Sequence, residues 1–166
     1  MWCPDRTRGR HRITTQCPEA ELSQANTLRL MAVDADDLKI ISAACQDGVC
    51  KPADIAYEAR KRRFLIEFNR FRWENGEGDA QQRVRSALSL EDVTGVKARG
   101  LPPKSADLVL SLMSVEWEEG DEAPSGQFRL IFAGDGELVV SADCLDATLV
   151  DVSQPWPAKN RPAHKE

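Results

Sequence analysis

The sequence predicts an α+β domain built on a mostly antiparallel, strongly bent sheet or a partly open barrel. Apolar residues alternate with polar ones in several short runs, which is typical of half-buried strands. Turn-rich breaks separate these runs at the spacing of a meander, so we expect successive strands to pair. Only two segments carry apolar residues at helical spacing. They predict one helix on the N-terminal side of the domain and one short C-terminal helix.

The length of 166 residues suits a single domain with a sizeable core. We expect this α+β domain over residues 27–157. Residues 1–26 show no usable periodicity, which predicts a disordered N-terminal arm or an extension from a start codon assigned too early. Residues 158–166 are expected to form a flexible tail.

The domain is expected to begin with a strand at residues 27–33, where apolar residues alternate. Asp34 follows in the position of a helix N-cap. The apolar stripe of the expected helix consists of Leu38, Ile41 and Cys45. Gly48 is expected to end this helix, because glycine is favoured just beyond a helix C-terminus.

The longest strand signal follows a shorter strand at residues 54–59 and a basic turn at residues 60–63. Its apolar positions are Phe64, Ile66, Phe68, Phe71 and Trp73. The alternation slips by one residue after Phe68, which predicts a β-bulge near Asn69 and Arg70.

The remaining elements continue the antiparallel pattern. Further strands are expected at residues 84–90, 95–99, 108–118, 128–132 and 138–142. A phase slip within residues 108–118 predicts a second bulge or a bend. Gly134-Asp135-Gly136 predicts a tight hairpin. Asp143 is expected to cap the C-terminal helix, whose shared face consists of Leu145, Leu149 and Val152.

The composition argues against several classes of active site. The two histidines, His11 and His164, lie in the expected tails, which argues against a histidine-activated nucleophile or a zinc site. Five cysteines at irregular spacing indicate buried thiols. We therefore expect no catalytic residue, metal or cofactor. With no run long enough to span a membrane and no secretory signal, a cytoplasmic setting is predicted.

Charge divides the chain into a basic middle and an acidic end. Residues 50–104 carry twelve basic and eight acidic side chains, whereas residues 105–166 carry four and twelve. The candidate site is a basic face on the two middle strands, formed by Arg70, Arg72, Arg83 and Arg85, which Arg60 and Arg62 at the basic turn would widen. We expect these arginines to point outward, with Glu74 beside Arg83 and Arg72 beside Arg85.

Arginines that lie opposite each other across two strands are destabilising unless a negatively charged group balances them. That group is either an acidic side chain such as Glu67, or a phosphate or carboxylate bound by the guanidinium groups. The sequence thus favours a non-catalytic binding or scaffold domain that recognises a protein partner or a small anionic ligand. The alternatives are an enzyme that uses carboxylates alone and a weak nucleic-acid binder; the net charge of −5 argues against the latter. Oligomeric state is left open.

Several segments resemble an uncharacterised alphaproteobacterial family, domain-of-unknown-function family 2948. These segments are LRLMAVDADDLKIISAACQDGV, RRFLIEFNRFRWE, LEDVTGVKARGL and FRLIFAGDGELVVSADCLDATLVDV, followed by Trp156. The resemblance covers residues 28–156 and implies a bacterial cytoplasmic setting, but no reaction or site residue. In layout alone, the expected order of elements is also similar to pleckstrin-homology-like barrels.

Overall fold

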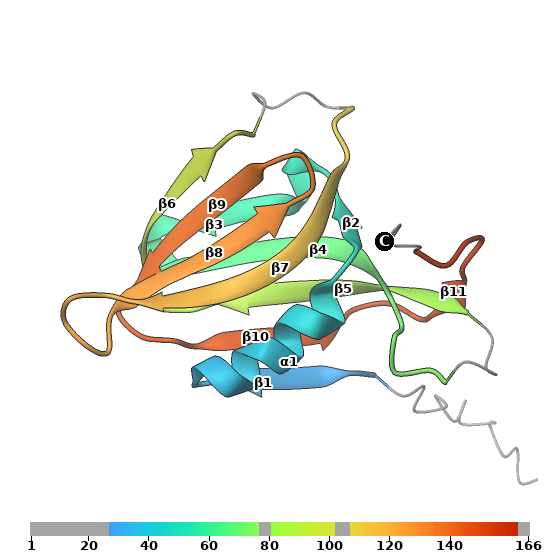
Figure 1. The fold of residues 1–166 in the computed structure, drawn as a ribbon, viewed down its shortest axis with the longest axis horizontal. Coiled ribbons are helices and arrows are strands. Elements are labelled where there is room, and N and C mark those ends of the chain that lie inside the picture. Colours follow the sequence, from blue (N-terminus) through green and yellow to red (C-terminus); the bar gives the residue numbers. More distant parts are fainter. Residues whose placement is uncertain (1–26, 77–80, 102–106, 163–166) are drawn as a thin grey trace, which may run out of the picture.

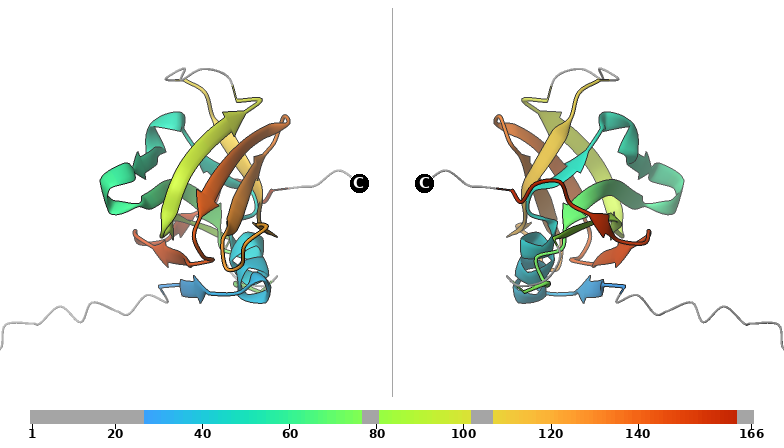
Figure 2. Two further views of the ribbon diagram at one scale, coloured as in Figure 1. Left: turned by 90° about the vertical axis from the view of Figure 1, so that its left-hand side faces the viewer. Right: turned by 90° about the vertical axis from the view of Figure 1, so that its right-hand side faces the viewer.

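The computed structural model describes residues 27–76, 81–101 and 107–162, which form one bent antiparallel sheet and one α-helix. The strand order is β1-β10-β5-β4-β2-β7-β8-β9-β6, with β3 paired to β4 and β11 paired to β5. The short strand β2 joins two arms of the sheet: the β4 arm (β1, β10, β5, β4) and the β7 arm (β7, β8, β9, β6). Figure 2 shows these arms facing each other, as in a partly open barrel. The predicted bent antiparallel sheet with an N-terminal-side helix is confirmed.

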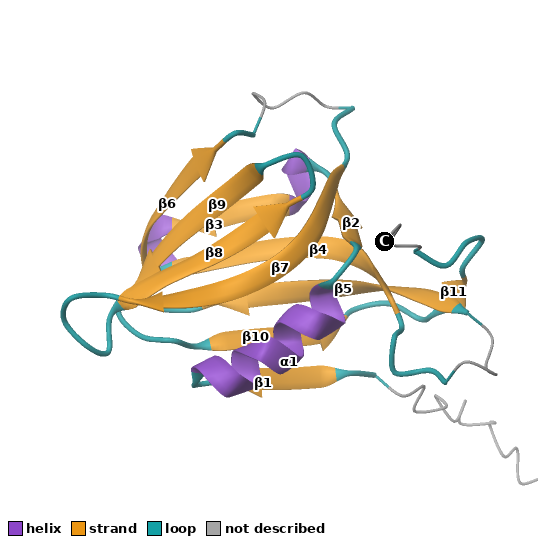
Figure 3. Ribbon diagram, viewed as in Figure 1, coloured by secondary structure: helices purple, strands orange, loops and turns teal. Residues whose placement is uncertain are grey.

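Strands outnumber helices in the described chain (Figures 1 and 3). The strands are β1 (Arg29–Ala32), β2 (Gly48–Cys50), β3 (Ile55–Glu58), β4 (Arg63–Phe71), β5 (Gln82–Leu90), β6 (Val93–Arg99), β7 (Leu110–Glu119), β8 (Gly126–Phe132), β9 (Gly136–Ala142), β10 (Ala147–Asp151) and β11 (Trp156–Pro157). The helices are α1 (Ala35–Cys45) and the 3₁₀ turns η1 (Pro52–Asp54) and η2 (Ala59–Lys61). The expected arm at residues 1–26 lies outside the described residues.

Helix α1 begins as predicted, because the Asp34 carboxylate caps it. One Asp34 carboxylate oxygen accepts hydrogen bonds from the backbone N–H groups of Asp36 (3.0 Å) and Asp37 (2.8 Å). The predicted apolar stripe, Leu38, Ile41 and Cys45, is buried. This stripe packs the helix against β1 and β7, so α1 covers one open side of the bent sheet.

The prediction that Gly48 ends α1 is wrong. The helix ends at Cys45, Asp47 takes the left-handed conformation (φ 61°), and Gly48 begins β2. A Cβ atom on Gly48 would lie 2.6 Å from the Phe68 ring and 2.8 Å from the Cys45 carbonyl oxygen. Glycine is therefore required here for the close approach of β2 to β4.

The bulge predicted near Arg70 is absent from β4. Its pairing with β5 is continuous from Phe64 opposite Leu90 to Phe71 opposite Arg83. Arg70 takes the inward position that follows Phe68, so the apparent phase slip is a charged residue on the core-facing side of an unbroken strand. The second predicted bulge is confirmed, because the β7–β8 register shifts between Leu112 and Ser114.

The predicted C-terminal helix is also wrong, because Ala147–Asp151 form strand β10 between β1 and β5. Leu145 and Leu149 both point inward, and their spacing fits either a strand or a helix. Val152 would share their face in a helix, but it is 53% exposed. β10 satisfies backbone edges of two neighbouring strands at once, which a helix at this position would leave unpaired.

The β8–β9 hairpin forms at the predicted glycine-rich turn. Gly134 and Asp135 have φ angles of 86° and 63°, as a tight hairpin of this kind requires. The large buried side chains of the core come from both arms, including Phe64, Ile66, Phe68, Phe128, Leu130 and Phe132. The two arms therefore share one hydrophobic core.

Candidate functional site

Arg70 is fully buried (0% exposed), which contradicts its expected outward orientation. Its Nε donates to Asp151 Oδ1 (2.9 Å) and Ser86 Oγ (3.1 Å). Nη2 donates to Asp151 Oδ2 (2.9 Å) and Glu74 Oε1 (2.8 Å), and Nη1 donates to Glu74 Oε2 (2.9 Å). Every nitrogen of the guanidinium group thus has a partner within the protein. We call these four residues, Arg70, Glu74, Ser86 and Asp151, the Arg70 cluster.

The Arg70 cluster connects four strands of the β4 arm. Asp151 in β10 accepts a hydrogen bond from Ser86 Oγ of β5 (2.6 Å) and from the backbone N–H of Leu28, next to β1 (3.1 Å). Arg70 supplies the link to β4. Since the charges of Arg70 and its carboxylate partners balance within the protein, the cluster has the character of a structural ion pair rather than an open anion site.

The cluster also shifts the acidity of Glu74. Burial on its own would raise the pKa of this carboxyl, but the hydrogen bonds and charge of Arg70, with a bond from Arg72, outweigh it and lower the pKa to about 2. A carboxyl whose pKa falls on folding stabilises the protein above its unfolded pKa, and this stabilisation is lost as the pH falls towards the folded value.

We therefore expect unfolding by urea to become easier as the pH falls from about 4.5 to about 2, because protonation of Glu74 breaks its bonds to Arg70. Glu74→Gln should be less stable than the wild type at neutral pH, with a shallower loss of stability over this pH interval. The matched control is Glu119→Gln, which changes an exposed carboxyl. Equal pH slopes for wild type and Glu74→Gln would contradict the assignment.

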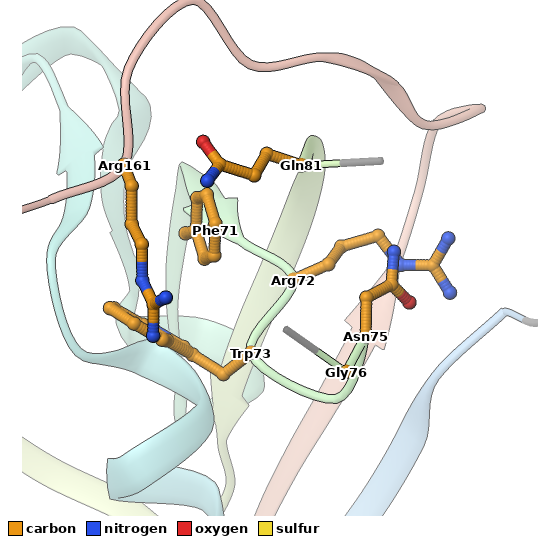
Figure 4. Close-up of a pocket in the computed structure, with 7 residues that line it drawn as sticks. All are labelled: Phe71, Arg72, Trp73, Asn75, Gly76, Gln81 and Arg161. Carbon is orange, nitrogen blue, oxygen red and sulfur yellow. The ribbon is translucent and has the colours of Figure 1, made fainter. Parts of the chain in front are cut away.

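Arg72 and Arg85 also have partners within the protein. Arg72 is 7% exposed, and its Nη1 donates to Gln82 Oε1 (2.9 Å). Figure 4 shows its side chain extending past Asn75, away from Trp73. Arg85 forms ion pairs with Glu67 (2.8 Å) and Asp54 (2.9 Å). Acidic side chains of the protein therefore balance its charge, which is the first of the two alternatives that the sequence left open.

The expected register of these arginines is wrong. Arg83 faces Phe71 and Arg85 faces Asn69, so neither pairs with Glu74 or Arg72 across the strands. The difference is three residues, because β4 ends at Phe71 and Glu74 lies in the turn beyond it.

The other candidate arginines lie at opposite ends of the β4–β5 ribbon. Arg62 and Arg60 are next to the start of β4, where Arg62 bonds to Asp143 and to the Asp92 carbonyl oxygen. Arg83 lies opposite Phe71, the last residue of β4. The six candidate arginines therefore do not form one continuous basic face, and a role of Arg60 or Arg83 in binding stays a prediction.

The described cysteines are not activated nucleophiles. Burial raises the pKa of Cys45 and of Cys50 to about 12, so both thiols are protonated at neutral pH. Burial, followed by the nearby Asp92 carboxylate, raises the pKa of Cys144. Among the described residues, no group of three or more His, Cys, Asp or Glu side chains is arranged to hold a metal ion. His11 and His164 lie outside those residues.

A small cavity beside Trp73 is closed by the C-terminal segment (Figure 4). The Arg161 guanidinium lies 5.8 Å from the centre of the Trp73 ring, a cation–π distance. The cavity has a volume of about 30 Å³, close to that of a single water molecule. The contact between Arg161 and Trp73 thus holds the chain at residue 161 against the domain, and the cavity is too small for a ligand.

A larger, mostly apolar pocket lies between β3 and β6. Its volume is about 340 Å³. It is lined by Pro52, Ile55, Tyr57, Phe64, Val96, Ala98, Leu101, Leu108, Leu110 and Leu138, which define the apolar pocket. None of these side chains is charged, and the Tyr57 phenol is the one polar group among them. Phe64, Leu110 and Leu138 belong to the buried core, so the pocket reaches from the surface into the barrel interior.

The apolar pocket exists because the sheet does not close. β3 pairs with β4 and β6 pairs with β9, but β3 and β6 do not pair with each other. The start of β6 is instead tied to the turn between β3 and β4, where the Val93 N–H donates to the Arg62 carbonyl oxygen (2.8 Å). The pocket occupies the gap beyond this joint.

Sequence reasoning did not identify the apolar pocket. Alternation within the strands predicted at residues 54–59 and 95–99 places Ile55 with Tyr57, and Val96 with Ala98, on one face of each strand. The pattern indicates that the residues of each pair share a face, but it does not indicate that the two strands remain unpaired. That property depends on the arrangement of the whole sheet.

Fold and pocket together define a single-helix, partly open antiparallel barrel with an apolar mouth. Residues 28–164 match the model of the family described as Protein of unknown function (DUF2948), and the chain belongs to this family. Neither a search of curated proteins nor one of solved structures found a match. No helix of the described residues is long and apolar enough to cross a membrane.

Proposed function

We propose that this protein is a non-catalytic binding domain that takes an apolar group of its ligand or partner into the apolar pocket. The observation that carries the proposal is a concave site of about 340 Å³, lined by uncharged side chains, at the open edge of the barrel. Ligand pockets of proteins span roughly 300–1,000 Å³, are mostly apolar and occur in the mouths of barrels. The site has these features at the small end of the size range.

The chemistry around the apolar pocket supports binding rather than catalysis. Its lining offers no carboxylate, thiol or amine that could transfer a proton or attack a substrate. The described thiols elsewhere are free, which suits the reducing cytoplasm as the proposed setting.

The test is binding of N-phenyl-1-naphthylamine, an uncharged dye that fluoresces in apolar surroundings. We expect saturable binding by the wild type and a loss of at least about tenfold in affinity for Ala98→Phe, because the new ring fills the pocket. Ala98 is exposed in β6, so the larger side chain need not disturb the core.

The matched control is Ala56→Phe. Ala56 is also an exposed strand residue, in β3, but it does not line the apolar pocket. Its variant should bind the dye as the wild type does. Equal binding by Ala98→Phe and Ala56→Phe, or no saturable binding by the wild type, would refute the proposed function.

A further inference from the structure

Strand β6 has a free backbone edge beside the apolar pocket. Residues Val93–Arg99 pair with β9 along one edge. On the other edge, the bond from Val93 to Arg62 is the one backbone hydrogen bond of β6 to the described residues. Unpaired N–H and C=O groups of this kind are a template for an added strand.

Side chains alternate along this edge between apolar and basic. Val96 and Ala98 line the apolar pocket, whereas Lys97 and Arg99 are exposed on the opposite face of the strand. Neither Lys97 nor Arg99 forms an ion pair with any residue in the described part of the chain. The edge therefore offers an apolar side and a cationic side, at the two-residue period of a β-strand.

The charges also decide which strand the edge can accept. A second copy of β6 would bring its own Lys97 and Arg99 beside this basic edge, and like charges across strands are destabilising. Basic side chains and a register shift, which β6 shows between Val93 and Gly95, are common protections of an edge against self-association. A strand with acidic side chains avoids this like-charge repulsion on the basic side.

We propose that the partner of this site is an extended segment of another protein, with apolar and acidic residues in alternation, which adds to β6 as a strand. The inference rests on the proposed function and names its ligand class. Backbone hydrogen bonds form along the free edge of β6, apolar side chains enter the apolar pocket, and acidic side chains lie near Lys97 and Arg99. Side chains two residues apart in a strand are about 6.6–6.8 Å apart, so neighbouring apolar residues of the segment enter one pocket.

The test uses the full chain, the dye of the previous section and blocked heptapeptides. The first peptide carries leucine at even and glutamate at odd positions, and in the second, lysine replaces glutamate. Two further forms of the first peptide carry N-methyl groups on the leucine amides or on the glutamate amides. Because alternate amides of a strand point to opposite edges, one N-methylated form blocks the edge that pairs and the other leaves it free.

We expect the glutamate peptide to displace the dye and the lysine peptide to bind at least about tenfold more weakly, since two cross-strand charge contacts change sign. One N-methylated form should lose binding and the other should keep it. Lys97→Glu combined with Arg99→Glu should reverse the preference between the two charged peptides. Urea unfolding of this double variant checks that its fold is intact.

Four outcomes would overturn the proposal. Dye binding without any peptide binding would reject the peptide and leave the proposed function standing, whereas absence of dye binding would remove both. Peptide binding that leaves the dye in place would show a different site. Equal loss, or equal retention, for the two N-methylated forms would show that no strand is added.

Discussion

Arg70→Met is expected to destabilise the protein by about 3–5 kcal/mol, the cost of removing one partner of a buried ion pair. The Asp151 carboxylate would remain buried with hydrogen bonds from Ser86 and Leu28 but without its cationic partner. Urea unfolding followed by tryptophan fluorescence measures this loss.

A second substitution separates the charge from the packing. In Arg70→Met combined with Asp151→Asn, the buried charge is gone, while an amide oxygen can still accept the Leu28 N–H. We expect this double variant to recover about 1–3 kcal/mol relative to Arg70→Met alone. The surface control is Lys39→Met, which removes only an exposed pair with Asp36. A cost for Arg70→Met no larger than for Lys39→Met would disprove the role of the Arg70 cluster.

The Arg70 cluster shows where sequence patterns stop being sufficient. Strict alternation from Phe64 places Arg70 on the inward face, but the charge of its side chain suggested a bulge instead. What makes the inward position tolerable is Asp151, 81 residues further along the chain. Asp151 lies in a segment whose apolar spacing fits both helix and strand, so neither partner could be recognised without the other.

Local patterns were sufficient where the cause of the structure is local. The Asp34 cap, the apolar stripe of α1, the hairpin at Gly134 and the bulge in β7 all depend on neighbouring residues, and all were predicted. The apolar pocket depends instead on the gap between β3 and β6, two strands that lie far apart in the sheet order and do not pair. Strand order is a property of the whole chain, and alternation alone does not determine it.

The contact between β2 and β4 determines how the two arms meet, and it rests on the fit of Phe68 against Gly48. β2 pairs with β4 through Val49 and Asn69 and with β7 through three residue pairs, so this short strand carries the connection between the arms. The Phe68 ring is fully buried and occupies the space that a side chain at position 48 would need.

Phe68→Ala is expected to cost about 3–5 kcal/mol, because it leaves a cavity in the shared core. Gly48→Ala should cost about 1–3 kcal/mol by overpacking against the same ring. The matched control is Gly95→Ala in β6, where a Cβ atom meets nothing within 4 Å. Urea unfolding at neutral pH measures all three variants.

The double variant Gly48→Ala with Phe68→Ala tests the fit itself. Once the ring is absent, the added methyl group at position 48 has space on that side, and only the Cys45 carbonyl oxygen at 2.8 Å still opposes it. We therefore expect the combined cost to be smaller than the sum of the single costs by about 0.5–2 kcal/mol, as for residues in direct contact. Additive costs would show that β2 can shift away from Phe68, and the junction between the arms would then be looser than this packing implies.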